Sequence, residues 1–216
     1  MKPGLAEYFN RVIHADCIPV MRRMPGGSID LVVTDPPYLV DYRARDGRTI
    51  AGDRDGSWLR PAFTEIARLL KPDSFCVSFY GWNVAERFVW EWKRAGLRPV
   101  SHLAFVKDYG SRDGYTEGCH ESAYLLAKGR PPMPEKPIRD VLPREYTGNE
   151  FHPHQKPVSS LEPLIKTFSR VGDVVLDPFA GSGSTGIAAR NCGRNFILIE
   201  KMERYHHNAC QRLNFS

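Results

Sequence analysis

The sequence is organised around the run Val174-Val175-Leu176-Asp177-Pro178-Phe179-Ala180-Gly181-Ser182-Gly183-Ser184-Thr185. Its apolar beginning predicts a short buried strand, and its glycines predict a tight turn that lets a ligand approach the backbone. The residues from Gly183 to Asn191 predict a helix, whose N-terminus would offer unpaired N–H groups and a partial positive charge. The pattern indicates a ligand-binding turn, although a purely structural strand-to-helix turn would also explain it.

Strands and helices are predicted to alternate on both sides of this run. The predicted strands are 11–14, 29–33, 74–80, 100–106, 122–127, 174–176 and 196–199, and the predicted helices are 18–24, 58–70, 84–95, 157–170, 183–191 and 203–213. Polar loops are predicted at 41–57 and 108–120, and a proline-rich irregular segment at 130–151. The alternation predicts an α/β domain with a mostly parallel sheet, in which ligands bind beyond the carboxyl ends of the strands.

The glycine turn departs from two phosphate-binding patterns. It is not GxGxxG, which disfavours a dinucleotide, and it is not GxxxxGK[ST], which disfavours a nucleoside triphosphate. The next predicted strand ends at Glu200, about 20 residues beyond the turn, where a carboxylate is well placed to bind a ribose diol. A helix-capping role beside Lys201 would also explain this glutamate. We interpret the turn and Glu200 together as an adenosine-binding half-site.

A second motif, Asp35-Pro36-Pro37-Tyr38, follows the predicted strand 29–33. Two prolines fix φ and remove two donors, so this turn is stiff and presents carbonyls. The exocyclic amino group of a base needs two acceptors, which the Asp35 carboxylate and the Pro36 carbonyl can provide, and Tyr38 can stack on the ring. An ordinary carboxylate, with a pKa of about 4, is too weak to deprotonate a neutral amine. We therefore expect Asp35 to orient the amine, with the proton leaving after methylation; a structural turn is the alternative.

Composition sets the broad class of the protein. The chain has 216 residues, of which 42% are hydrophobic and 25% charged, as in ordinary soluble globular domains. It has neither an apolar run of about 18 residues nor an apolar N-terminal stretch, so we expect a cytoplasmic protein without a membrane contact. Its net charge of +5 favours an anionic partner such as nucleic acid. The five cysteines form no CxxC pair, which predicts neither a disulfide framework nor a metal site.

Taken together, the motifs resemble those of the β-class amino-methyltransferases of DNA, in which the Asp-Pro-Pro-Tyr motif precedes the glycine motif. The resemblance covers nearly the whole chain and is carried by residues 14–17, 35–38, 121–129, 152–157, 177–185 and Glu200. It implies a Rossmann-like S-adenosylmethionine-dependent methyltransferase fold with circularly permuted motif order. The expected sheet has seven strands, six parallel and one antiparallel, with helices on both faces.

The resemblance also implies a reaction and its residues. The expected activity is transfer of a methyl group from S-adenosyl-L-methionine to the N6 amino group of adenine in DNA, by in-line attack on a flipped base. Such enzymes occur in restriction–modification systems. The catalytic residues implied are Asp35, Pro36, Pro37 and Tyr38. The cofactor-binding residues implied are Asp16, Cys17, Asp35, His154, Gln155, Lys156, Pro157, Asp177, Phe179, Gly181, Ser182, Gly183, Thr185 and Glu200. Lys156 and Pro157 open a helix that would suit the carboxylate of the cofactor.

Target recognition has little sequence available to it. Members of the family often carry a substantial recognition segment before the element at 152–157, and here only 130–151 can supply one. We expect a single methyltransferase domain over residues 1–216, with recognition loops within 41–57, 108–120 and 130–151 or help from a partner subunit, such as a homodimer. The candidate DNA contacts are Arg43, Arg45, Arg48, Arg54 and Arg112. Interspersed aspartates are equally consistent with a solvated loop.

Other functions remain open. The nearest is N4-cytosine methylation, which uses the same acceptors on the same kind of amine; in the family, Asp at position 35 favours adenine and Ser would favour cytosine. An RNA methyltransferase, a protein glutamine methyltransferase and a catalytically inert DNA-binding remnant are further alternatives. C5-cytosine chemistry commonly uses a Pro-Cys nucleophile, and the sequence contains no such dipeptide.

Overall fold

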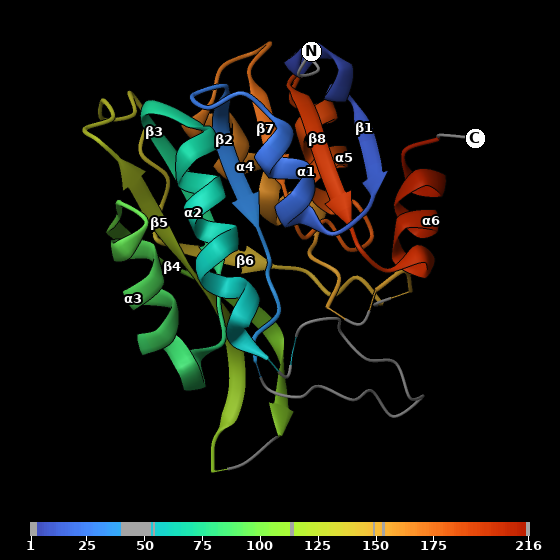
Figure 1. Ribbon diagram of the computed structural model, residues 1–216. Helices are drawn as coiled ribbons and strands as arrows, with labels where there is room; N and C mark the ends of the chain where they lie inside the picture. The colour runs from blue at the N-terminus through green and yellow to red at the C-terminus, as the bar shows by residue number, and fades with distance from the viewer. Residues whose placement is uncertain are drawn as a thin grey trace.

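One eight-stranded sheet forms the middle layer of the protein in the computed structural model (Figure 1). The structure describes residues 4–39, 53, 55–112, 115–148, 150–152 and 154–214, with residues 111 and 112 described in their backbone alone. The strands are β1 (Arg11–His14), β2 (Ile29–Thr34), β3 (Leu70–Phe79), β4 (Leu97–Arg112), β5 (Glu117–Lys128), β6 (Val141–Arg144), β7 (Val174–Asp177) and β8 (Asn195–Glu200). Their order in the sheet is β1-β8-β7-β2-β3-β5-β4-β6.

All strands of this sheet run parallel except β5. This strand is antiparallel to both of its neighbours, β3 and β4, because it returns from β4 through a hairpin. The first and last parts of the chain meet in the sheet, where β1 pairs with β8 and His14 faces Glu200. The mostly parallel α/β fold that the sequence predicts is therefore confirmed.

Helices cover both faces of the sheet. They are α1 (Cys17–Arg23), α2 (Leu59–Leu69), α3 (Ala85–Arg94), α4 (Val158–Phe168), α5 (Ser184–Asn191) and α6 (Glu203–Arg212), with short 3₁₀ turns at Leu5–Tyr8, Gly56–Trp58 and Trp82–Val84. Two cores separate the layers, one under α1, α2 and α3 and the other under α4 and α5. Alternation along β2 sends Val32 into the first core and Leu31 and Val33 into the second. Within the described residues, no helix has both the length and the apolar character needed to cross a membrane.

Two predictions for the part of the sheet formed by β5, β4 and β6 are wrong. The predicted loop 108–120 is mostly a hairpin, because β4 and β5 stay paired as far as Arg112 and Glu117. The sequence did not predict this hairpin because its outer residues extend beyond the other strands, where neither face packs on a core and no alternation of apolar residues is needed. The segment predicted to be irregular, 130–151, contains β6, which pairs with β4 at the edge and makes the eighth strand. Pro143 lacks the N–H that a central strand would need, so its presence argued against a strand in this segment. β6 can contain it because β6 lies at the edge of the sheet.

Candidate active site

The two sequence motifs meet in one cleft at the carboxyl ends of the parallel strands. Strand β2 leads into the Asp35–Tyr38 turn, and its neighbour β7 leads into the glycine turn. Both turns line the same cleft, which has a volume of about 420 Å³. Small-molecule sites usually fall between about 300 and 1,000 Å³. The structure thus brings together the predicted catalytic and cofactor-binding motifs.

Most of the predicted site residues line this cleft. They are Asp16, Cys17, Asp35, Pro36, Pro37, Tyr38, His154, Gln155, Lys156, Asp177, Phe179, Gly181, Ser182, Thr185 and Glu200. Two predicted residues are not among those that line it: Pro157, the N-cap of α4, and Gly183, the N-cap of α5, which has a φ of 81°. The arginines predicted to contact DNA, namely Arg43, Arg45, Arg48 and Arg54, lie outside the described residues, as does the side chain of Arg112.

The glycine turn is held by a buried carboxylate. Asp177 ends β7 and accepts hydrogen bonds from the Thr185 hydroxyl at 2.7 Å and from the Phe179 N–H at 3.1 Å. Burial raises the pKa of Asp177 to about 7, against the hydrogen bonds that favour its charged form. Gly181, with a φ of 51°, turns its N–H toward Glu200 and donates to Oε2 at 2.8 Å. A residue with a side chain would be strained at that φ.

Glu200 and Asp16 lie at the ends of the neighbouring strands β8 and β1, as predicted. The other Glu200 oxygen, Oε1, accepts a hydrogen bond from the Met202 N–H at 2.7 Å, and burial raises the pKa of the carboxyl. A carboxylate has about four acceptor positions, and Glu200 accepts from the backbone of Gly181, Lys201 and Met202, so it retains room to accept a hydroxyl from a ligand. Asp16 accepts from the Ile18 N–H at 3.0 Å and thereby caps α1.

Two apolar features complete this part of the cleft. The Trp58 ring stands edge-on to Phe179, with the ring centroids 5.0 Å apart. Trp58 was not singled out in the sequence because it lies at the border of a polar segment and has no motif around it. Burial raises the pKa of Cys17 to about 12, so this thiol lines the cleft in its neutral form.

The Asp35–Tyr38 turn is held by charges. The Tyr38 hydroxyl donates to Asp35 Oδ1 at 2.7 Å, and the Lys156 ammonium donates to Asp35 Oδ2 at 2.6 Å and to the Tyr38 oxygen at 3.2 Å. The sequence assigned Lys156 to the cofactor. Its side chain does line the cleft, but its buried ammonium binds the Asp35 carboxylate.

Two charged residues behind Lys156 had no assigned role in the sequence. Glu121 Oε2 lies 3.1 Å from the Lys156 ammonium, and Glu121 Oε1 lies 3.1 Å from Nη2 of Arg144. Burial opposes ionisation of Glu121, but the charges of Lys156 and Arg144 outweigh it and lower its pKa to about 2. Glu121 is the first residue of the segment 121–129 that carries part of the family resemblance, and this was the only indication of a role for it in the sequence. Arg144 lies in the unpredicted strand β6 and had none.

The far side of the Asp35–Tyr38 turn depends on a glycine and a second carboxylate. A Cβ on Gly81, just after β3, would lie 2.5 Å from the Tyr38 carbonyl oxygen, so the turn requires glycine there. Asp53 is buried and accepts a hydrogen bond from the Leu39 N–H at 2.8 Å. Asp53 belongs to the predicted polar loop 41–57, and its buried carboxylate fixes the backbone that leaves the turn.

His154 and Gln155 lie beside these groups. The His154 ring is nearly perpendicular to that of Tyr38, with centroids 6.2 Å apart, and burial together with the Lys156 charge lowers its pKa. Gln155 accepts a hydrogen bond from the Phe151 N–H at 3.3 Å. The imidazole is therefore an uncharged wall of the cleft near neutral pH.

The comparison with protein families agrees with this geometry. The family described as DNA methylase, of the N6 and N4 methyltransferase type, matches residues 29–211. The chain belongs to this family. The methylase is 53% identical over 204 residues to the Escherichia coli (strain K12) protein named "Putative methylase YubD", covering 94% of this chain and 90% of that protein. It is 31% identical over 248 residues to DNA adenine methyltransferase YhdJ of the same organism, covering 94% and 82%.

Solved structures share the fold of the methylase. The M1.HpyAVI–SAM complex matches with a TM-score of 0.75 and 25% identity, over 95% of this chain and 99% of that one. The cytosine-N4-specific PvuII DNA methyltransferase matches with a TM-score of 0.77 and 18% identity, over 93% and 85%. The second match concerns the fold alone.

Proposed function

We propose that this methylase transfers a methyl group from S-adenosyl-L-methionine to the N6 amino group of adenine in DNA. One observation carries the proposal: the Asp35–Tyr38 turn and the glycine turn with Glu200 line one cleft. A donor bound at the second turn and a base amine bound at the first would share this space. Positioning of the two reactants is the main source of acceleration that such a site offers.

The residues present fit the methyl donor. Glu200 retains acceptor capacity for the ribose hydroxyls, and Asp16 lies on the adjoining strand end at the same wall of the cleft. The apolar surface of Phe179 and Trp58 suits a flat ring. M1.HpyAVI, a structural relative, was crystallised with S-adenosylmethionine. When bound, this cofactor supplies an electrophilic methyl group on a sulfonium.

The chain's own groups hold the nucleophile. Each Asp35 oxygen already accepts one hydrogen bond and has room for another, so the carboxylate can receive an N–H of the base amine. The Pro36 carbonyl is the proposed second acceptor. Because the carboxylate is a poor base for a neutral amine, the proton leaves toward Asp35 only after the nitrogen has become cationic. Tyr38 keeps the carboxylate in place through its hydroxyl.

Adenine is favoured over cytosine by two observations. The catalytic turn begins with Asp35, and a relative with 31% identity is named a DNA adenine methyltransferase. N4-cytosine methylation is the alternative, since the amine and its acceptors are of the same kind. The PvuII enzyme, which is specific for cytosine N4, shares the fold at 18% identity.

Nucleoside mass spectrometry would test the proposal. The protein is incubated with defined duplex DNA and isotope-labelled S-adenosylmethionine, and the DNA is digested to nucleosides. We expect labelled N6-methyladenine. Labelled N4-methylcytosine would overturn the adenine assignment, and transfer only to RNA or to glutamine would overturn DNA as the substrate. An absence of binding heat with S-adenosylmethionine would instead support an inert remnant.

A further inference from the structure

Four charged side chains of alternating sign stand in a row behind the catalytic turn. Asp35, Lys156, Glu121 and Arg144 are joined by successive contacts of 2.6, 3.1 and 3.1 Å. Their side chains are 20%, 6%, 21% and 4% exposed, so the two cations are the most deeply buried members. The row draws on four separate parts of the chain: the β2 turn, β5, β6 and the segment before α4.

A contribution to the stability of the fold is a weak explanation for such a row of buried charges. Removing charges from water costs several kcal/mol per ion, and apolar residues of similar volume often stabilise a core as well or better. The inner end of the row, however, is the carboxylate that the proposed reaction uses. We propose that Glu121 and Arg144 are positioning residues for methyl transfer, which act through Lys156 to fix the place and the effective charge of the Asp35 carboxylate. The inference rests on the proposed function.

Electrostatics explains why two further charges are needed. If the Lys156 ammonium faced Asp35 alone, it would weaken this carboxylate as an acceptor for an amine that becomes cationic. Glu121 shares the ammonium and restores negative potential at Asp35, and Arg144 holds Glu121 in place from its other oxygen. With a pKa of about 2, Glu121 is a poor proton acceptor. The row therefore acts by position and field and does not carry the proton.

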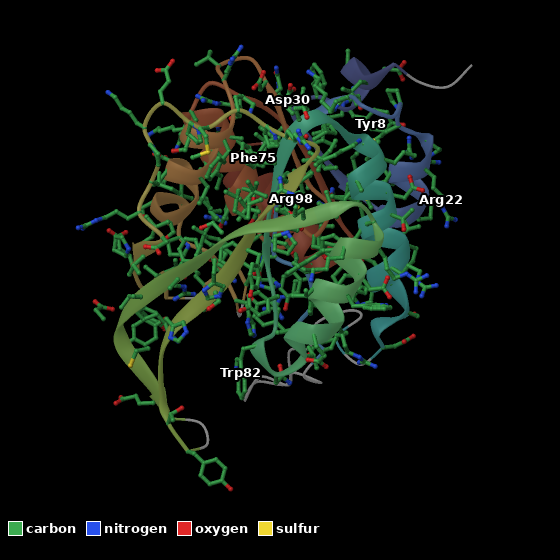
Figure 2. The ribbon with its side chains drawn as sticks, turned by 90° about the vertical axis from the view of Figure 1, so that its left-hand side faces the viewer. Tyr8, Arg22, Asp30, Phe75, Trp82 and Arg98 are labelled. Carbon is green, nitrogen blue, oxygen red and sulfur yellow. The ribbon has the colours of Figure 1, made fainter. Side chains whose placement is uncertain are left out.

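The outer end of the row is anchored on the β4–β5 hairpin. Nη1 of Arg144 donates to the Tyr109 hydroxyl at 2.8 Å, and the Tyr109 ring packs edge-on against Tyr146. Figure 2 shows this hairpin reaching well beyond the body of the sheet. β6, which carries Arg144, pairs with β4 at the base of the hairpin. The segments that sequence reasoning treated as loop and irregular chain thus supply the support for the catalytic carboxylate.

The test compares charge-removing variants of similar shape. Glu121→Gln is measured beside Glu145→Gln, a control that changes an exposed glutamate next to Arg144, bonded to Ser159. Transfer of labelled methyl to DNA gives kcat and KM, calorimetry gives the affinity for S-adenosylmethionine, and melting gives Tm. We expect kcat of Glu121→Gln to fall on the order of 10²-fold, as for a small misplacement of a reacting group. Cofactor affinity should stay unchanged, and the control should match the wild type.

Charge compensation separates a positioning role from a structural one. Arg144→Gln should also lose kcat, and the double variant Glu121→Gln/Arg144→Gln should retain more activity than the product of the two single losses, because it removes opposite charges together. Tyr109→Phe removes only the hydroxyl that accepts from Arg144, so it should lower kcat less than Glu121→Gln. If Glu121→Gln does not fold, the decrease of kcat in this variant tests the inference instead. A wild-type kcat in Glu121→Gln would overturn the inference. So would a double variant whose loss of kcat equals the product of the two single losses, if these losses run parallel to the decreases in Tm. A wild-type protein that transfers no label would instead refute the proposed function.

Discussion

The glycine turn and the Asp35–Tyr38 turn, which we propose as the catalytic turn, leave neighbouring strands of one sheet, yet they are held in different ways. The glycine turn is held from nearby in the sequence: Asp177 binds Phe179 and Thr185, and Glu200 binds Gly181 from 19 residues away. The catalytic turn is held by Lys156, which is 121 residues from its partner Asp35. Neutral N–H and O–H donors shape the first turn, and a formal positive charge braces the second.

This difference separates two kinds of failure. Changes at the glycine turn should weaken the cofactor's binding, because its groups face the ligand and are held by local hydrogen bonds. Changes around the Asp35–Tyr38 turn should lower the rate at saturating cofactor, because they displace or discharge the carboxylate that we propose to meet the amine. Each prediction below would sharpen or break this separation.

The largest effect is expected at Asp35. Asp35→Ala removes the acceptor and frees Lys156, and we expect kcat to fall by about 10³-fold, the upper range for loss of one oriented transition-state contact. Cofactor affinity measured by calorimetry should be largely intact, since Glu200 and the glycine turn are untouched. Asp35→Asn serves as the matched control for shape. Loss of cofactor binding in Asp35→Ala, with DNA binding unchanged, would place Asp35 on the cofactor side of the comparison.

Gly81 should give the next largest effect. Gly81→Ala puts a Cβ 2.5 Å from the Tyr38 carbonyl oxygen, so the turn must move. A displacement of this size is expected to lower kcat by about 10²-fold while cofactor affinity is retained. Gly4→Ala is the matched control, because nothing lies within 4 Å of a Cβ at that position. Equal kcat values for the two variants would show that the turn is not held as tightly as the contacts suggest.

The same comparison explains what the sequence could reveal. The glycine turn was predicted residue by residue, because a strand, a glycine turn and a helix follow one another within a dozen positions and each has its own local pattern. Glu200 was predicted because the spacing from the turn is fixed by the return through one helix. Local sequence was enough wherever the partners of a residue are close to it in the chain.

The support of the catalytic turn could not be predicted in this way. Nothing local shows that Lys156 would reach Asp35, or that Glu121 would share its ammonium. Arg144 lies in the edge strand β6, whose polar residue and proline give no alternation of apolar residues from which a strand could be predicted. The approach of Gly81 to Tyr38 depends on the pairing of β2 with β3. These contacts follow from tertiary structure, where burial and long-range pairing decide the partner.

Glu200 should show the opposite behaviour to Asp35. Glu200→Gln removes a charged acceptor from the cofactor side, so we expect affinity for S-adenosylmethionine to fall about tenfold, or about 1.4 kcal/mol, with kcat at saturation little changed. Burial raises the pKa of Glu200, so wild-type affinity should also weaken on acidification at higher pH than for an ordinary glutamate. The Gln variant should lack this dependence. Calorimetry across pH would check both, and a pH-dependent Gln variant would assign the effect elsewhere.

The last effect is expected on stability and not on activity, at the buried carboxyl of the glycine turn. The pKa of Asp177 is raised from 3.8 to about 7 in the folded protein. Below pH 3.8 the carboxyl is protonated in both states, so its favourable contribution to stability is fully present there. This contribution is lost as pH rises toward 7, because unfolding then allows a proton to be released. Asp177→Asn cannot titrate, so its Tm relative to the wild type should rise between pH 4 and 7.

Melting curves of the two proteins over this range would measure the difference. A chain of this size changes Tm by about 2–4 °C for each kcal/mol, so the effect is resolvable. The Asn side chain can still accept from the Phe179 N–H and donate to the Thr185 hydroxyl, so the turn should keep its shape. Parallel curves would mean that folding does not raise the pKa of Asp177 and that an ionised carboxylate holds the glycine turn over this pH range. The contrast between the two turns would then rest only on their donors, which are neutral N–H and O–H groups at the glycine turn and an ammonium at the Asp35–Tyr38 turn.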